Sequence, residues 1–310
     1  MSTVSTPSGM PGSKRAGALP TAIVTASYRG DFERCRLLCE SIDTRVSGHT
    51  RHLILVEGAD VPLFRQLAGP RREIVDERDV LPWWLRAFPD PTNFGRRRIW
   101  LQPKGPPLRG WHVQQLRRFA VAASIDETVM VNVDSDVVFF RPFAVADLVD
   151  EGRVRFYRVP AEHHEILPHL RDEHAAWSRK AGELLGITAP RETSVGYIAT
   201  VIAWRTDTAR DMARRIEAVT GRSYLAALAA TRTLSECTIY GRFVDEVEGR
   251  PDRHLASPDR LCRIYWAGEA LDAAALDRFV DALEPGQVAA GIQSFTRTDP
   301  ALIRRAAGLA

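Results

Sequence analysis

The sequence predicts an α/β fold with a mixed, mostly parallel central sheet flanked by helices. In the first half of the chain, apolar strand patterns alternate with helix patterns, as they do in parallel sheets. The stretch 129–140 is an apolar, β-branched run typical of a strand buried on both faces. The chain has 310 residues, of which 45% are hydrophobic, so it is long enough for one large α/β domain or two small ones, and we expect one.

The first elements follow from residue patterns. A strand is expected over Thr21–Ala26, and Asp31 is placed to cap the next helix, whose buried face begins at Phe32. A second strand is expected over His52–Val56, followed by a short helix around 64–67 and a third strand at 74–75. This order indicates parallel pairing.

The segment 81–110 differs in character, being rich in proline, aromatic residues and arginine, with the cluster Arg96-Arg97-Arg98. It predicts a long loop, and such loops are usually functional or mobile. Two interpretations remain open: it folds over a phosphate-bearing ligand, or it is an insertion whose tryptophans pack on the core. The helix expected next, over Trp111–Ile125, leads into the buried strand.

The rest of the chain continues as a mixed half. We expect strands over 154–159, 197–204 and 288–292, a loop over 250–260, and helices over 169–185, 208–219, 224–230, 235–247, 273–283 and 300–307.

Composition limits the function. The formal net charge is only +3, so a nucleic-acid partner is not expected. The four cysteines, Cys35, Cys39, Cys237 and Cys262, form no C-x-x-C pair, which favours reduced thiols in a cytoplasmic protein. Residues 1–20 lack the apolar core of a signal peptide, and no apolar run is long enough to span a bilayer. A membrane-borne substrate would therefore be reached by peripheral contact.

Two carboxylates interrupt the buried run. If the strand ends near Asp134, then Asp134 and Asp136 lie where its carboxyl end opens into a loop, the edge at which open α/β sheets bind ligands. Two hard oxygen donors suit Mg²⁺ or Mn²⁺ that carries a substrate phosphate. The alternative is a turn in which these carboxylates accept hydrogen bonds from backbone amides.

Four segments, Thr25–Cys39, Gly110–Ala123, Val131–Phe143 and Leu234–Val244, together resemble a bacterial family of GT-A-like proteins of unknown function. The resemblance implies a single GT-A-like, Rossmann-like domain of glycosyltransferases over 21–310, preceded by a disordered leader over 1–20. In this division 21–143 is the nucleotide-binding half and 144–310 the acceptor half.

The resemblance also implies a metal-dependent transfer of sugar from a nucleotide-diphosphate sugar, a UDP- or GDP-sugar, to a hydroxyl or amine acceptor. Asp134 and Asp136 would hold Mn²⁺ or Mg²⁺, which stabilises the departing diphosphate. The acceptor, whether polysaccharide, glycolipid or natural product, stays open. The candidate donor-binding residues are Thr25, Ser27, Tyr28, Gln114, Arg117, Asn132 and Ser135.

A second site block lies at 233–241. Ser235 is expected to cap a helix and place Glu236 in its first turn, as in the family's Ser-Glu-x-x-x-Tyr-Gly pattern. Glu236 is the candidate catalytic residue, as the base for an acceptor hydroxyl or as a group that positions the acceptor. Related proteins often draw a further metal ligand from a late histidine, but we interpret His254 as a solvated loop residue.

Two other functions compete with this one. A haloacid-dehalogenase-like phosphotransferase also uses an Asp-x-Asp at a strand end, but it normally carries Ser or Thr two residues after the second Asp, where this chain has Val138. A catalytically silent protein that binds a sugar nucleotide is the third reading, and turnover of nucleotide-sugar with acceptor would separate it from an enzyme.

Overall fold

The computed structural model describes residues 19–95, 97–162 and 168–309, so most of the predicted leader lies outside the described residues. At its centre is a five-stranded sheet in the order β13-β8-β1-β3-β4. Strands β1, β3, β4 and β8 of this sheet run parallel to one another, and β13 runs antiparallel to β8. The predicted mixed, mostly parallel sheet is thus confirmed. Its strands are β1 (Thr21–Ala26), β3 (Arg51–Val56), β4 (Arg72–Asp76), β8 (Val129–Val133) and β13 (Val201–Arg205).

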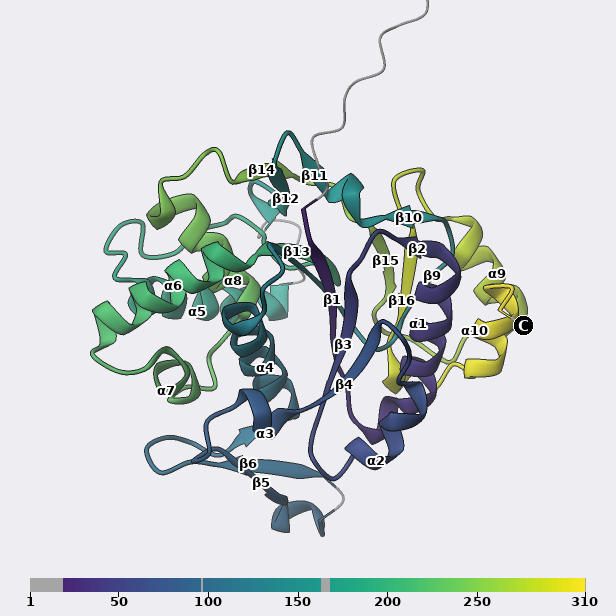
Figure 1. Cartoon of the computed structure of the whole chain (residues 1–310), viewed down its shortest axis with the longest axis horizontal. Coiled ribbons are helices and arrows are strands. Elements are labelled where there is room, and N and C mark those ends of the chain that lie inside the picture. The colour runs from purple at the N-terminus through teal and green to yellow at the C-terminus, as the bar shows by residue number, and fades with distance from the viewer. Residues whose placement is uncertain (1–18, 96, 163–167, 310) are drawn as a thin grey trace, which may run out of the picture.

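Strand β1 is buried on both faces, because one long helix lies on each side of it (Figure 1). Ala22 and Val24 pack with the side chains of α4 (Gly110–Ser124), whereas Ile23 packs with those of α1 (Phe32–Arg45). Successive side chains of a strand point to opposite faces, which explains this division. Both predicted helices are confirmed.

The α4 side also carries the helices of the second half, with α6, α7 and α8 in contact with α4 (Figure 1). The expected helices therefore exist, with ends shifted by a few residues. They are α5 (Pro168–Leu185), α6 (Thr206–Thr220), α7 (Tyr224–Ala229) and α8 (Glu236–Phe243), the last continued by a π-helical turn at Val244–Glu248.

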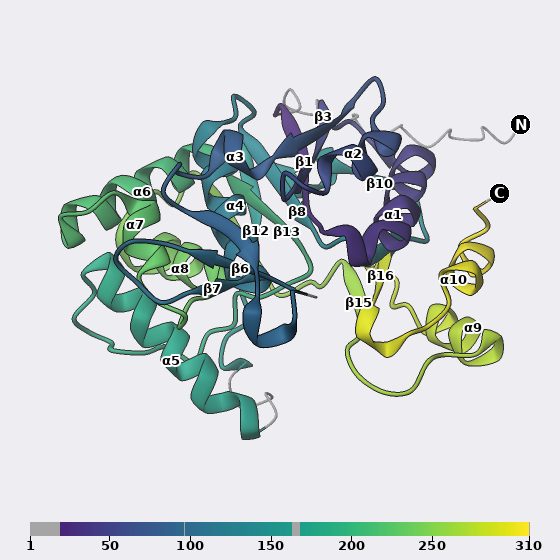
Figure 2. The ribbon, with the colours of Figure 1, turned by 90° about the horizontal axis from the view of Figure 1, so that it is seen from below.

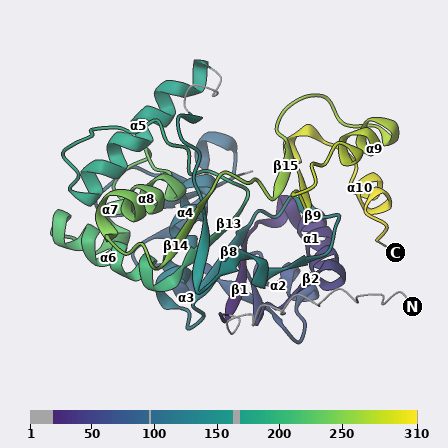
Figure 3. The ribbon, with the colours of Figure 1, turned by 90° about the horizontal axis from the view of Figure 1, so that it is seen from above.

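The α1 side carries a second layer built from the end of the chain (Figures 2 and 3). A three-stranded sheet in the order β15-β16-β9 lies there, and α1 contacts both β9 and the last helix. The elements are β9 (Val137–Phe139), β15 (Cys262–Tyr265), β16 (Ala289–Ile292), α9 (Ala273–Asp281) and α10 (Pro300–Ala306). Strand β15 was not predicted.

The long loop predicted over 81–110 is wrong in part. This segment folds into a small antiparallel sheet of β5 (Arg86–Pro89), β6 (Arg98–Leu101) and β7 (Leu108–Arg109), at the lower edge of the molecule in Figure 1. Its strands are short and interrupted by prolines, which hides their alternation in the sequence.

The loop predicted over 250–260 also contains a strand, β14 (His254–Ser257), parallel to β12 (Arg153–Tyr157). The remaining short elements complete the connections. They are β2 (Val46–Ser47), α2 (Val61–Phe64), α3 (Glu77–Val80), β10 (Phe143–Ala144) and β11 (Val149–Asp150), and the 3-10 turns are Arg29–Asp31, Arg65–Leu67, Pro91–Asn93, Val145–Leu148 and Ser294–Thr296.

Candidate active site

Polar residues follow three neighbouring strands of the central sheet. Because β8, β1 and β3 are parallel and adjacent, their carboxyl ends meet at one edge. Asp134 follows β8, Ser27 follows β1 and Glu57 follows β3. Strand β8 ends at Val133, so Asp134 opens the loop at the predicted point. Ligands of open α/β sheets bind at this kind of edge.

Three carboxylates gather there. Burial and the negative charges of Asp134 and Asp31 raise the pKa of Asp136 to about 7. Its Oδ1 is buried and has no hydrogen-bond partner among the described residues. A buried acceptor without a donor, close to like charges, is costly unless a cation or a donor from a ligand satisfies it.

The third carboxylate of this cluster is Asp31, which was predicted from the sequence to cap the following helix. It precedes α1, but its side chain makes no cap hydrogen bond to that helix, so the predicted cap is wrong. Instead the Ser135 hydroxyl donates to Oδ2 of Asp31 at 3.4 Å. Burial raises the pKa of Asp31 as well.

Arg118 of α4 joins two of the predicted site residues. Its guanidinium is ion-paired with Asp134 and also donates to Oε1 of Glu236 at 2.7 Å. Gln114, one turn earlier on α4, donates to Oδ1 of Asp134 at 3.4 Å. The strand-end carboxylate and Glu236 are thus held in one network, although a hundred residues separate them in the sequence.

Helix α8 is seated against α4 by several contacts. The Ser235 hydroxyl caps it by accepting from the Thr238 amide, as predicted. The Glu236 amide donates to Oε1 of Gln115 at 2.9 Å. The ring of Tyr197 lies directly against Gly241, where a Cβ atom would come within 2.2 Å of it. The glycine of this block therefore permits close packing of α8.

A cavity of about 800 Å³ opens beside these residues. It lies between the strand ends and the small sheet, whose Arg97 and Arg98 line it. Five of the seven predicted donor-binding residues line it too: Ser27, Tyr28, Gln114, Arg117 and Ser135. Its size lies in the range of small-molecule sites.

The other two predicted donor-binding residues lie beneath the surface. Thr25 is fully buried, and its hydroxyl is 3.0 Å from Nε2 of His52. Asn132 is 1% exposed within β8, and both polar atoms of its amide lack partners among the described residues. Contact of Thr25 with a ligand is not supported, because its hydroxyl is used inside the sheet. The structure gives no physical account of the unpaired Asn132 amide.

Arg117 lines the cavity but is already paired. Its Nε donates to Oε2 of Glu77 at 3.0 Å, and both side chains are 6% exposed. The indole of Trp100 donates to the other oxygen of Glu77 at 2.9 Å. Glu77 of α3 therefore links α4, through Arg117, to the small sheet, through Trp100. A phosphate could contact only those guanidinium N–H groups of Arg117 that Glu77 does not occupy.

None of the four described acidic residues that line the cavity, Asp31, Glu57, Asp60 and Asp90, was predicted as a site residue. Asp60 is 5% exposed and accepts from the backbone amide of Arg29 at 2.9 Å and from its Nε at 2.7 Å. Glu57 accepts from Arg98 at 2.8 Å. The sequence signal available for Glu57 and Asp60 was their position just after the second strand, at the edge where ligands bind.

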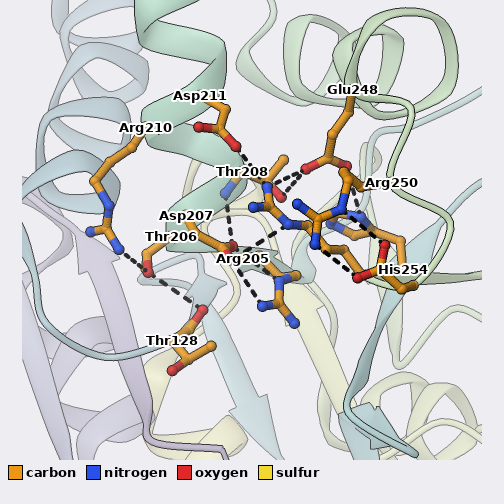
Figure 4. Close-up of polar contacts among 12 residues, drawn as sticks. Thr128, Arg205, Thr206, Asp207, Thr208, Arg210, Asp211, Glu248, Arg250 and His254 are labelled. Atoms are coloured by element: carbon orange, nitrogen blue, oxygen red, sulfur yellow. Dashed lines mark hydrogen bonds and ion pairs between the residues drawn. The ribbon is translucent and has the colours of Figure 1, made fainter.

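His254 is not a solvated loop residue, so that interpretation is wrong. It lies in β14 with a side chain 5% exposed, its Nδ1 3.2 Å from Glu248 and its Nε2 3.0 Å from the Tyr240 hydroxyl. Figure 4 shows it within a polar cluster formed mainly by α6 and the segment before β14. In that cluster Arg253 donates to Asp211 and Glu248. These contacts involve none of the carboxylates at the strand ends.

Within residues 19–95, 97–162 and 168–309, no three or more His, Cys, Asp or Glu side chains are arranged to hold a metal ion on their own. Carboxylates that share a cation with substrate phosphates and water need not form such a set, which is usual for Mg²⁺. Across the same residues, no helix has the length and apolar character needed to cross a membrane.

Comparison with known proteins gives a family without an assigned activity. The model of the family of unknown function DUF6492 matches residues 15–307, so the chain belongs to that family. No curated protein matches. Among solved structures, the chain is similar to an active-site mutant of LgtC at 14% sequence identity and a TM-score of 0.44, over 87% of this chain and 86% of that one. A similarity this low supports no assignment of function.

Proposed function

For this member of a family of unknown function, we propose a metal-dependent glycosyltransferase that moves a sugar from a nucleotide-diphosphate sugar to an acceptor hydroxyl or amine. One observation carries the proposal. The unpartnered, buried Oδ1 of Asp136 lies among the carboxylates of Asp134 and Asp31, beside a cavity that arginines line. This combination calls for a cation on one side and an anionic ligand on the other.

Asp134 and Asp136 are the residues that would hold Mn²⁺ or Mg²⁺, with substrate phosphate and water as the other ligands. Hard oxygen donors of this type are the ligands both ions prefer. When bound, such a cation supplies positive charge to the diphosphate that leaves the sugar. The unpartnered Oδ1 of Asp136 fits this role, since no side chain among the described residues satisfies it.

The chain's own cations would orient the rest of the donor. Arg97, just before β6, and Arg98, its first residue, line the cavity. Arg97 is suited to bind phosphate oxygens, whereas Arg98 is already ion-paired with Glu57. Tyr28, which follows β1 and is 54% exposed, offers a ring on which a base can stack. Gln114 and Ser135 also line the cavity and could bind the ribose or sugar hydroxyls.

Glu236 was predicted as the catalytic residue, and we now propose that it positions other groups. Its carboxylate is 8% exposed and ion-paired with Arg118, which also holds Asp134. To accept a proton from the acceptor, Glu236 would have to leave that pair. In its paired state it fixes the direction of Arg118 and so the place of Asp134.

We also propose the domain division expected from the sequence. Asp134 lies near the end of the proposed nucleotide-binding half, 21–143, and Glu236 lies in the proposed acceptor half, 144–310. We also propose a cytoplasmic enzyme, which the four free, buried cysteines favour.

A direct test is the release of nucleoside diphosphate. The protein is incubated with Mn²⁺ and each of a panel of UDP- and GDP-sugars, and UDP or GDP is measured with water and then with simple sugars as acceptors. Mn²⁺-dependent release supports the proposal. Binding of UDP or GDP without release favours a silent binding protein, and release of inorganic phosphate from sugar phosphates favours the phosphotransferase.

A further inference from the structure

The small sheet has two faces of different character. Ala87, Trp100 and Leu108 are cross-strand neighbours on one face, which is turned to the core. The opposite face carries Phe88 and Ile99 as one pair and Arg86 and Leu101 as the next. A two-faced sheet of this kind normally leaves polar side chains on its open face. Here the open face is largely apolar.

The apolar residues of this segment are well exposed. Phe88 is 46% and Leu101 is 43% exposed on the open face, while Trp83 is 77% exposed just before the sheet and Phe94 is 93% exposed in the turn between β5 and β6. Phe94 adopts a positive φ of 50° at the end of a 3-10 turn. A large contiguous apolar patch on the surface of a monomeric protein marks an interaction site, and exposed aromatic side chains of one short segment are candidates for such a patch.

The charged residues of this segment are almost all positive. Residues 81–110 contain six arginines and lysines and a single acidic residue, Asp90. Asp90 is 2% exposed, because it accepts from the Thr92 amide and hydroxyl. Arg86 and Lys104 are exposed. The surface that this segment presents is therefore both aromatic and positively charged.

We propose that the open face of the β5–β6–β7 sheet, together with Trp83 and Phe94, docks on an anionic lipid bilayer. Aromatic rings insert at the level of the headgroups, and arginine and lysine pair with anionic lipids at the same depth. Neither property alone selects a bilayer, but both belong to the segment 81–110, whose small sheet lies at the lower edge of the molecule in Figure 1. The inference does not depend on the proposed function.

Docking in this way also has a consequence for the cavity. Arg97 and Arg98, on the same small sheet, line the cavity. The cavity would then open close to the headgroup layer, within reach of an acceptor carried by a lipid. The protein would need no membrane-spanning helix for this.

Flotation with vesicles tests the proposal. The full chain is mixed with vesicles of phosphatidylcholine alone or of equimolar phosphatidylcholine and phosphatidylglycerol, and the floating fraction is measured at low and high salt. We expect flotation with the anionic vesicles, weakened by salt. No flotation, or equal flotation with both vesicle types, overturns the proposal.

Two paired variants separate the apolar and the charged contributions. Trp83→Ser with Phe94→Ser should lower the partition coefficient roughly tenfold at every salt concentration. Arg86→Gln with Lys104→Gln should lower it roughly fivefold for each cation removed, at low salt only. None of these four residues lines the cavity, so UDP or GDP binding with Mn²⁺ should stay unchanged, which separates this proposal from the proposed function.

The matched control lies on α6, where Arg214→Gln with Val219→Ser removes one cation and one exposed apolar side chain. This variant should float as the unmodified protein does. The proposal is overturned if the control variant loses as much flotation as the Trp83 and Phe94 variant, or if the Trp83 and Phe94 variant floats as the unmodified protein does. Self-association that depends on Trp83 and Phe94, in the absence of vesicle binding, would instead assign the face to a second copy of this chain.

Discussion

The guanidinium of Arg118 donates to Oε1 of Glu236 at 2.7 Å, although the two residues lie 118 positions apart. The same guanidinium holds Asp134 at the end of β8. One arginine therefore fixes a strand-end carboxylate against a helix of the second half. Because Arg118 is buried and both partners are carboxylates, their charges hold its pKa above the usual arginine value despite the cost of burial.

Loss of Arg118 should destabilise the protein strongly. Arg118→Gln leaves Asp134 and Glu236 without their shared cation, and breaking a buried pair in this way costs about 3–5 kcal/mol. Adding Glu236→Gln should restore part of that loss, since one of the two unpaired charges is then removed. Urea unfolding of the three variants measures this, and strictly additive effects would contradict the coupling.

Glu236→Gln by itself separates positioning from binding. Glutamine can still accept from Arg118, so the fold and the affinity for UDP or GDP with Mn²⁺ should change little. Turnover should fall at least about tenfold if the direction of Arg118 matters in the transition state. Glu236→Asp, which keeps the charge, should recover more turnover than Glu236→Ala. If all three variants turn over as fast as the unmodified enzyme, Glu236 has no positioning role in the reaction.

Asp136→Asn should weaken binding and strengthen the fold at the same time. Removing a buried charge beside Asp134 and Asp31 should raise stability without metal by on the order of 1 kcal/mol. The variant should also lose Mn²⁺-dependent binding of UDP and GDP in calorimetry, and Mn²⁺ should no longer raise its Tm.

Asp134→Asn should lose the same binding but gain no stability, because Asp134 is ion-paired with Arg118. Asp277→Asn, an exposed substitution on α9, is the control and should change neither property. Unaltered Mn²⁺-dependent binding by the Asp136 variant would refute the metal assignment.

His52 should make the fold sensitive to acid. Arg72 donates to its Nδ1 at 3.2 Å, so the ring is neutral and carries its proton on Nε2, toward Thr25. Burial, with the charges of Arg72 and His49, holds the pKa of His52 well below its ordinary value of 6.5. The unfolded chain then binds the proton more readily, and stability falls as the pH drops below about 6.5.

The substitution His52→Gln removes the loss of stability that protonation of His52 causes at acid pH. Between about pH 6.5 and pH 5 the unmodified protein should lose up to about 1.4 kcal/mol more per pH unit than the variant. Urea unfolding at a series of pH values gives both slopes, and parallel slopes would exclude His52 as the cause. His49, which is also buried, is present in both proteins, so its own titration contributes to both slopes.

The cysteines should be unreactive in the folded protein. All four are free and buried, and burial contributes to raising the pKa of Cys35, Cys237 and Cys262 well above the usual thiol value. Thiolates are the reactive form, so Ellman's reagent should modify them only after unfolding. Rapid modification of a native thiol would show that its segment opens readily.

The central sheet was predictable from the sequence because its strands carry a local signal. Strands such as β1 and β8 are apolar on both faces, and polar residues follow them where they end. Asp134 and Asp136 could be placed at the sheet edge for that reason. The function of that edge is a proposal, which no residue pattern decides.

The network around Arg118 could not be predicted in the same way. The apolar positions of α4 leave Arg117 and Arg118 off the stripe, where charged residues usually face water. Here α4 is surrounded, and both arginines are buried against Glu77, Asp134 and Glu236. Such pairing depends on tertiary contacts between distant segments, as does the role of Asp31.

The place of β13 in the sheet affects how the chain can fold during synthesis. Strand β8 pairs with β1 on one side, and on its other edge it pairs with β13, which begins at Val201. Until that segment leaves the ribosome, the apolar strand β8, which ends at Val133, keeps an open edge that other chains can join. We therefore expect the first half alone to aggregate more readily than the whole chain.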